Sequence, residues 1–145
     1  MRADQQCVLV VEDNAHDREM LVRAFELAGM DGIVETVRTG PEAIEFLRGR
    51  YDFERIRPAR PALVLLDIKL PYRDGLSVLA DIKDDERTKT IPVVMLTSSG
   101  EAGDIEAAYR AGANAYIVKP TNFSEFVANI RDTVQFWLAV NTNAK

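Results

Sequence analysis

The sequence predicts an α/β fold, a doubly wound (βα)5 domain with five parallel strands and five helices. Short apolar runs alternate with segments of helical periodicity, and that rhythm is typical of βαβ units around a parallel sheet. The chain has 145 residues, 47% of them hydrophobic, which suits one compact domain with a single core. No internal repeat or low-complexity tract interrupts the pattern.

The first two strands and helices are predicted from residues 7–47. Residues 7–11 are apolar throughout, as in a strand covered on both faces. A helix follows from about Ala15 and is closed by Gly29, since glycine commonly stands just beyond a helix end. Residues 33–38 alternate and indicate a second, more exposed strand. The next helix begins at residues 39–41, with proline in its first turn and two inward-facing residues, Ile44 and Leu47.

The middle of the chain contains a long connection before the third strand. Residues 49–61 show neither period, and loops of this length are uncommon in compact domains. Their arginines alternate with acidic, aromatic and proline residues, so we interpret them as a solvated loop and not as a nucleic-acid arm. Residues 63–66 form the third apolar run. Residues 71–75 are a turn into a helix whose inward residues are Leu76, Leu79 and Ile82.

The last third of the chain predicts two more strands and two more helices. Residues 93–96 and 115–118 are apolar runs, separated by a polar segment and a weak helix at 104–111 that Gly112 ends. A final helix runs from about Ser124 to near Val140. Its apolar residues at helical spacing form one stripe that should be core: Phe123, Phe126, Val127, Ile130, Val134, Trp137 and Leu138.

Right-handed crossovers that cover both faces favour the strand order 2-1-3-4-5. The strands that end at Val11 and Leu66 then lie side by side, which places Glu12, Asp13 and Asp67 together. Ligands bind beyond the carboxyl ends of such strands. The sequence therefore predicts three carboxylates, joined by Thr97 and Lys119 from later strand ends, at one site.

Close carboxylates repel one another, so either one of them takes a proton or a cation binds. Oxygen ligands with an open position suit Mg²⁺. We expect Asp13 and Asp67 to be direct ligands, Glu12 to act through a water molecule, and the backbone carbonyl of Lys69 to complete the shell. An alternative role for Asp13 is to cap the following helix.

Asp67 is the predicted nucleophile, because carboxylates form aspartyl phosphates and a cation screens the approach of the donor. Transfer also requires stabilisation of three phosphoryl oxygens. We expect Mg²⁺ to contact one, Lys119 another and the Thr97 hydroxyl a third. The Lys119–Pro120 bond is a candidate for a cis peptide.

Charge and cysteine content exclude several classes of protein. The net charge is −5 and no block of basic residues stands out, which argues against a nucleic-acid partner. No apolar segment approaches the roughly 18 residues needed to span a bilayer, and the N-terminus lacks a signal-peptide core. We expect a cytoplasmic protein with no membrane partner. The one cysteine, Cys7, opens an apolar run and is expected to be a buried structural thiol.

An ordered set of residues at the strand ends resembles the receiver domain of two-component response regulators. The set covers about residues 6–140 and comprises Glu12-Asp13, Asp67 with Pro71 and Gly75, Thr97-Ser98, Tyr116 and Lys119-Pro120. The resemblance implies a flavodoxin-like fold. Chemotaxis receivers of this same family are themselves the standard example of the strand order 2-1-3-4-5, so the order and the resemblance are one inference.

The resemblance also implies the function. Asp67 would accept a phosphoryl group from a sensor histidine kinase, with Mg²⁺ held by Glu12 and Asp13, while Thr97 and Lys119 contact the phosphoryl group. Tyr116 would change rotamer with Thr97 to signal the state. Residues 1–145 would be a single receiver domain with no output domain, and the protein would be a signalling phosphoacceptor and not an enzyme beyond its own phosphotransfer and dephosphorylation.

Two features of the sequence indicate a narrower branch of the receiver family and a surface for a second copy of the chain. The segment Asp67-Ile68-Lys69-Leu70-Pro71 and the aromatic pair near the C-terminus resemble single-domain regulators paired with phytochrome-type kinases. Phe136 and Val140 fall off the core stripe of the last helix. We expect them, with the fourth helix and fifth strand, to form the signalling face and a homodimer contact.

Three other functions on this fold are less favoured. Aspartyl-phosphate hydrolases resemble a pattern with a second Asp two residues after the nucleophile, where this chain has Lys69. A flavin or dinucleotide binder needs a glycine-rich cradle, but residues 12–15 are Glu-Asp-Asn-Ala. A receiver-like module that is never phosphorylated is disfavoured because every charged residue of the site is present.

Overall fold

A parallel sheet forms the centre of the chain and confirms the predicted topology. The computed structural model describes residues 6–49 and 60–144, so the predicted loop at 49–61 lies almost wholly outside the described residues. The sheet has the order β2-β1-β3-β4-β5. Its strands are β1 (Val8–Val11), β2 (Val34–Val37), β3 (Leu63–Leu66), β4 (Val93–Thr97) and β5 (Ala115–Val118).

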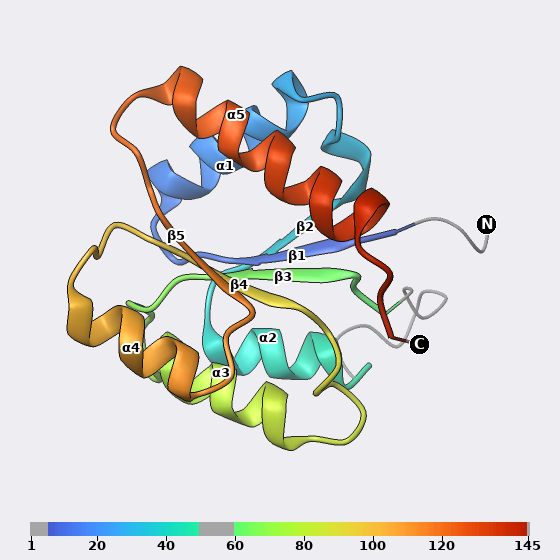
Figure 1. Cartoon of the computed structure of the whole chain (residues 1–145), viewed down its shortest axis with the longest axis vertical. Helices are drawn as coiled ribbons and strands as arrows, with labels where there is room; N and C mark the ends of the chain where they lie inside the picture. Colours follow the sequence, from blue (N-terminus) through green and yellow to red (C-terminus); the bar gives the residue numbers. More distant parts are fainter. Residues whose placement is uncertain (1–5, 50–59, 145) are drawn as a thin grey trace.

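Helices cover both faces of this sheet (Figure 1). They are α1 (Ala15–Leu27), α2 (Gly40–Leu47), α3 (Gly75–Asp84), α4 (Ala102–Arg110) and α5 (Phe123–Gln135). Helices α1 and α5 lie on one side, and α2, α3 and α4 lie on the other. None of the helices within the described ranges is both long and apolar enough to cross a bilayer.

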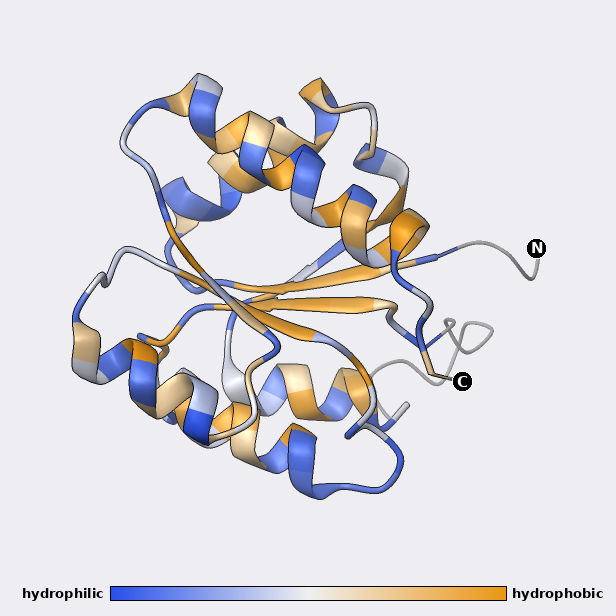
Figure 2. Ribbon diagram, in the orientation of Figure 1, coloured by the Kyte–Doolittle hydropathy of each residue, from blue (hydrophilic) through white to orange (hydrophobic). Residues whose placement is uncertain are grey.

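The core consists of two apolar clusters, one on each face of the sheet. Alternate residues of a strand point to opposite faces, so Leu9 and Val11 join one cluster while Val8 and Val10 join the other. Figure 2 shows hydrophobic strands between helices in which hydrophobic and hydrophilic residues alternate along the chain. The predicted stripe of α5 is confirmed: Phe126, Ile130 and Val134 are buried, and the other four residues pack against that cluster.

Helix ends follow from local chemistry. Asn14 caps α1 by accepting a hydrogen bond from the backbone N–H of Asp17 at 2.9 Å, and Asp74 and Asn122 cap α3 and α5 in the same way. Gly29 and Gly112 have positive φ angles of 76° and 109° just beyond α1 and α4, where a left-handed residue ends a helix at little cost.

Several local predictions are corrected. Helix α4 begins at Ala102, two residues before the predicted start. In α2, by contrast, the prediction is confirmed, since the inward-facing Ile44 and Leu47 pack against the core, where Ala43 and Phe46 are also buried. Cys7 is partly and not fully buried.

The Lys119–Pro120 peptide is trans, because the described residues contain no cis bond. The chain turns away after β5 without one.

The last helix also changes form: α5 gives way to a π-helical turn, Phe136–Val140. The N–H of Asn141 donates to the carbonyl of Phe136 at 2.6 Å, which closes that wider turn.

Lys83 fastens the amino ends of β4 and β5. Its ammonium donates to the carbonyl of Ile91 at 2.8 Å, the side-chain oxygen of Asn114 at 2.8 Å and the carbonyl of Lys89 at 3.3 Å. Partial burial lowers the pKa of Lys83. These bonds fix the end of the sheet opposite to the predicted site.

Gly75 is the point of closest backbone approach near the site. A Cβ atom there would lie 2.0 Å from the carbonyl oxygen of Asp67, and the Gly75 N–H donates to the carbonyl of Ile68 at 2.6 Å. Only glycine fits without a shift of backbone, which is expensive in a packed structure.

We therefore expect Gly75→Ala to lower the free energy of unfolding by about 2 kcal/mol or more, because the methyl group forces β3 and α3 apart. The measurement is urea unfolding followed by circular dichroism. Gly103→Ala in α4 is the matched control, since nothing lies within 4 Å of its Cβ position, and it should stabilise the helix by about 0.5–1 kcal/mol. Similar unfolding midpoints for the two variants would contradict the close backbone approach at Gly75.

Candidate functional site

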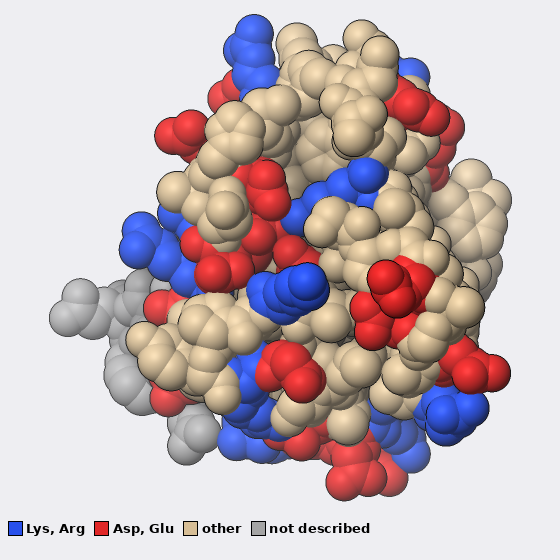
Figure 3. Space-filling model, turned by 90° about the vertical axis from the view of Figure 1, so that its left-hand side faces the viewer, with Lys and Arg blue, Asp and Glu red and all other residues tan. Residues whose placement is uncertain are grey.

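Strand register brings the predicted site residues to one edge of the sheet. Val11 pairs with Leu66 across β1 and β3, so Glu12 and Asp67, the next residues along each strand, are neighbours. The N–H of Asp67 donates to the carbonyl of Val11 at 3.3 Å. In Figure 3, which faces the carboxyl ends of the strands, acidic side chains gather beside basic ones around a hollow.

The side chain of Lys119 forms ion pairs with carboxylates at this edge of the sheet. Its backbone N–H donates to the carbonyl of Thr97 at 2.8 Å, which places the residue beside the end of β4. Its ammonium lies 2.7 Å from Oε1 of Glu12 and 3.3 Å from Oδ2 of Asp67. The structure thus brings Glu12, Asp67 and Lys119 into direct contact, as the sequence predicts.

Burial changes the electrostatics of these groups. Glu12 is 2% exposed, and burial raises its pKa to about 7, an effect that the charge of Asp67 adds to and Lys119 opposes. Burial alone would lower the pKa of Lys119. The hydrogen bond to Glu12 and the charges of Asp67, Glu12 and Asp17 together outweigh burial, so the pKa of Lys119 is raised. The ammonium is therefore held in its charged form.

Asp13 lies beside this contact but outside it. Its side chain is exposed, and its carbonyl, like that of Glu12, accepts a hydrogen bond from the guanidinium of Arg18, at 3.1 and 3.2 Å. The alternative role for Asp13 as a helix cap is wrong, because Asn14 is the cap of α1. The carboxylate of Asp13 remains open to solvent at the edge.

The loop after β4 joins Thr97 to Tyr116 through Ser99. Thr97 is 1% exposed, and its hydroxyl oxygen accepts from the Ser99 N–H at 3.4 Å. The Tyr116 hydroxyl donates to the Ser99 carbonyl at 2.8 Å, and the Ser99 hydroxyl donates to Asp104 at 2.5 Å. Burial raises the pKa of Tyr116. Both predicted switch residues therefore touch one loop residue.

The loop after β3 is held in a tight conformation. The backbone N–H of Lys69 donates to Oδ1 of Asp67 at 3.3 Å, while the Lys69 side chain is exposed. Tyr72 has a φ of 70°, which is rare for a residue other than glycine. The neighbouring Arg73 fixes this bend by bonding to Ser77 and pairing with Asp81 at 2.7 Å.

The donor set suits a hard cation, but not through a closed cage. Within the described ranges, no three acidic, histidine or cysteine side chains are grouped so that they could hold a metal ion. The ammonium of Lys119 contacts both Glu12 and Asp67. Among the predicted ligands, Asp67 follows β3, the exposed Asp13 follows the neighbouring β1, and Lys69 lies two residues after Asp67. Mg²⁺ commonly binds one or two carboxylates and keeps several waters, so these residues fit it.

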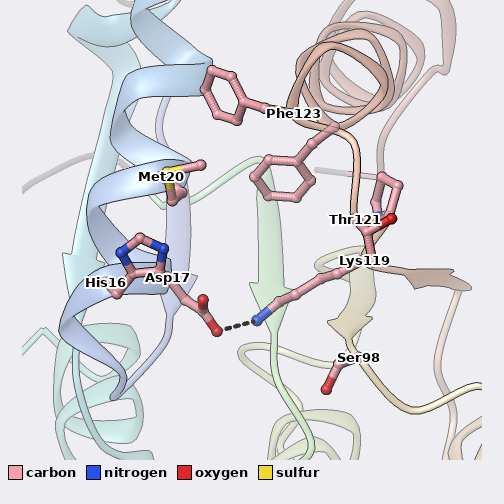
Figure 4. A pocket seen from close by; sticks show the side chains of 9 residues that line it. His16, Asp17, Met20, Ser98, Lys119, Thr121 and Phe123 are labelled. Atoms are coloured by element: carbon pink, nitrogen blue, oxygen red, sulfur yellow. Dashed lines mark hydrogen bonds and ion pairs between the residues drawn. The ribbon is translucent and has the colours of Figure 1, made fainter.

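Sequence reasoning missed Asp17, which also contacts Lys119, at 3.2 Å. Figure 4 shows this pair at the mouth of a cavity of about 300 Å³ between α1 and the start of α5. His16, Met20 and Phe123 also line it. Asp17 is the acidic residue in the first turn of α1, the helix that begins two residues after Asp13, and this closeness to the strand end could have identified it.

Comparisons with known proteins agree with this geometry. Residues 8–131 match the model of the response regulator receiver domain. FilR2 of Methanothrix harundinacea, a probable methanogenesis regulatory protein, is 38% identical over 138 residues, covering 95% of this chain and 87% of FilR2. The response regulator Rcp1 of Synechocystis is 34% identical over 135 residues, covering 93% and 90%.

Two solved structures share the fold over almost the whole chain. The phosphorylated cyanobacterial phytochrome response regulator RcpA has a TM-score of 0.85 at 37% identity, covering 97% of this chain and 99% of RcpA. The Mn²⁺-bound form of Rcp1 has a TM-score of 0.83 at 33% identity, with the same coverage. Sequence, fold and the residues at the strand ends lead to one conclusion: the chain belongs to the response regulator receiver domain family, whose members are signalling proteins.

Proposed function

We propose that this chain is the receiver of a two-component response regulator, and that its Asp67 accepts a phosphoryl group from a sensor histidine kinase. The observation that carries the proposal is the contact of the Lys119 ammonium with both Asp67 and Glu12 at the carboxyl ends of the strands. A carboxylate beside a fixed cation at an open edge can attack phosphorus, because the ammonium stabilises charge on the transferred group.

The chain's own residues would divide the work of transfer. An oxygen of Asp67 forms the new bond to phosphorus as the donor's P–N bond breaks, and Lys119 contacts one phosphoryl oxygen. The Thr97 hydroxyl and nearby backbone N–H groups would contact others. Mg²⁺, held by Asp13, Asp67 and the Lys69 carbonyl with Glu12 close by, would supply charge screening at the site. The Mn²⁺-bound structure of Rcp1 supports a divalent cation.

The Thr97–Ser99–Tyr116 contacts support a route from the site to the surface. When Thr97 turns toward a phosphoryl oxygen, Ser99 loses a partner, and Tyr116 is bonded to that same residue. The signal would thus reach α4, β5 and α5. The kinase partner is proposed to be of the phytochrome type, because RcpA is a phytochrome response regulator.

A homodimer contact is proposed at the end of α5. Phe136 is 46% exposed and Val140 is 69% exposed, while the neighbouring Trp137 packs inward against the core. Exposed apolar residues of α4 and β5, Tyr109 and Val118, add to the apolar surface of the signalling elements. Large apolar residues that are exposed on these elements supply the kind of surface that interaction sites use.

The proposed phosphotransfer is tested with a small phosphodonor and Mg²⁺. The wild-type protein should form a hydroxylamine-labile adduct, detected by mass spectrometry, and chelation of Mg²⁺ should prevent it. Asp67→Asn should abolish the adduct, because the amide cannot attack phosphorus. Asp31→Asn, an exposed residue at the opposite end of the sheet, is the control. An adduct that persists in Asp67→Asn would refute the assignment of the nucleophile.

The dimer proposal is tested by sedimentation. Phe136→Asp should shift the protein toward the monomer, because it places a charge in the apolar contact. Leu27→Asp serves as the matched control, since Leu27 is also a large exposed residue, at 54%, but ends α1. A mass distribution of Phe136→Asp that is unchanged from wild type would count against the interface.

A further inference from the structure

Asp17 differs from the other partners of Lys119 in its origin. Glu12 and Asp67 follow the ends of β1 and β3, whereas Asp17 lies in the first turn of α1 and reaches the ammonium from the side. Figure 4 shows the two side chains meeting between α1 and the segment that leads into α5.

The three contacts of Lys119 differ in how exposed the partner is. The side chain of Glu12 is 2% exposed, that of Asp67 is 11% exposed and that of Asp17 is 42% exposed. A buried carboxylate that loses its partner keeps an unpaired charge away from water, which is costly. Asp17 can be rehydrated when it loses Lys119. Of the three contacts, the one to Asp17 is therefore the easiest to give up.

All three N–H groups of the Lys119 ammonium already donate to carboxylates. Lys119 has three N–H groups, and the three carboxylates accept from them at 2.7, 3.2 and 3.3 Å. When Asp67 is phosphorylated, its carboxyl group loses its charge, and the charged phosphoryl oxygens compete with the two remaining carboxylates for these three protons. Of these two carboxylates, Glu12 is buried and Asp17 is exposed, so Asp17 is the partner that can leave at least cost.

We propose that Asp17 is a positioning residue that acts as the exchangeable counter-ion of Lys119. It holds the ammonium while Asp67 is unmodified and releases it when a phosphoryl group arrives. This inference rests on the proposed phosphotransfer at Asp67. It assigns to Asp17 a control over how strongly the site holds a phosphoryl group, since every gain at the phosphoryl oxygen is offset by the loss of this ion pair. Release would also change the charged mouth of the cavity that both residues line.

The first test measures the affinity for beryllofluoride, a tetrahedral mimic of the phosphoryl group, in Mg²⁺ by ¹⁹F NMR. Asp17→Asn should bind it about two- to fivefold more tightly, the range expected for loss of a partly exposed ion pair. Glu19→Gln is the matched control, because it removes the same charge from an exposed position on the same helix. Equal gains in the two variants would show a general charge effect and overturn the proposal.

The second test reads the contact directly in the unmodified protein. The pKa of Lys119 is followed by NMR of lysines labelled at Cε, and the signal is assigned by its absence in Lys119→Arg. Asp17→Asn should lower that pKa, Asp17→Glu should restore both the pKa and the beryllofluoride affinity, and Glu19→Gln should change neither. A pKa of Lys119 that is the same in Asp17→Asn and wild type would overturn the proposal.

These measurements distinguish an error in the phosphotransfer proposal from an error in the role of Asp17. If wild-type protein binds no beryllofluoride and forms no adduct on Asp67, the phosphotransfer proposal is wrong and the role of Asp17 falls with it. If the wild type reacts and Asp17→Asn matches it in affinity, only the role of Asp17 is wrong. Thermal unfolding of each variant confirms that the comparison is made between folded proteins.

Discussion

The ammonium of Lys119 between two largely buried carboxylates is the interaction on which the geometry of this edge depends. Glu12 and Asp67 leave adjacent parallel strands, and without a cation between them their charges repel and burial penalises both. Removing one partner of such a buried group typically costs about 3–5 kcal/mol. In the proposed phosphotransfer, the residue that stabilises this edge also contacts the phosphoryl group, so the fold and the proposed chemistry depend on the same charge.

Much of this arrangement could be predicted because strands and their ends leave strong signals. A strand covered on both faces is apolar throughout, so the run that ends at Leu66 marks the position of Asp67 to the residue. The order of the strands then predicts that Asp67 lies beside Glu12, and the observed register of β1 and β3 confirms it. The core stripe of α5 was predictable for the same reason, since its period follows from helical geometry.

Other features depend on side-chain geometry that no periodicity records. Asp17 reaches Lys119 from a helix, and its role follows only when the path of Lys119 is known. The Lys119 ammonium lies among Glu12, Asp67 and Asp17, whereas Asp13, the third carboxylate of the prediction, stays outside this contact. The π-helical turn after α5 leaves no mark in the apolar periodicity, and the bond before Pro120 takes the trans form that most X–Pro bonds prefer.

Lys83 gives the sheet a fixed end. Its bonds to the chain near Ile91 and Asn114 tie down the points where β4 and β5 begin, whereas the opposite ends of those strands hold Thr97 and Lys119. Strands clamped at one end cannot slide past each other to absorb a disturbance. A displacement at the carboxyl ends of β4 and β5 is then expected to move the loops that follow these strands and not the strands themselves.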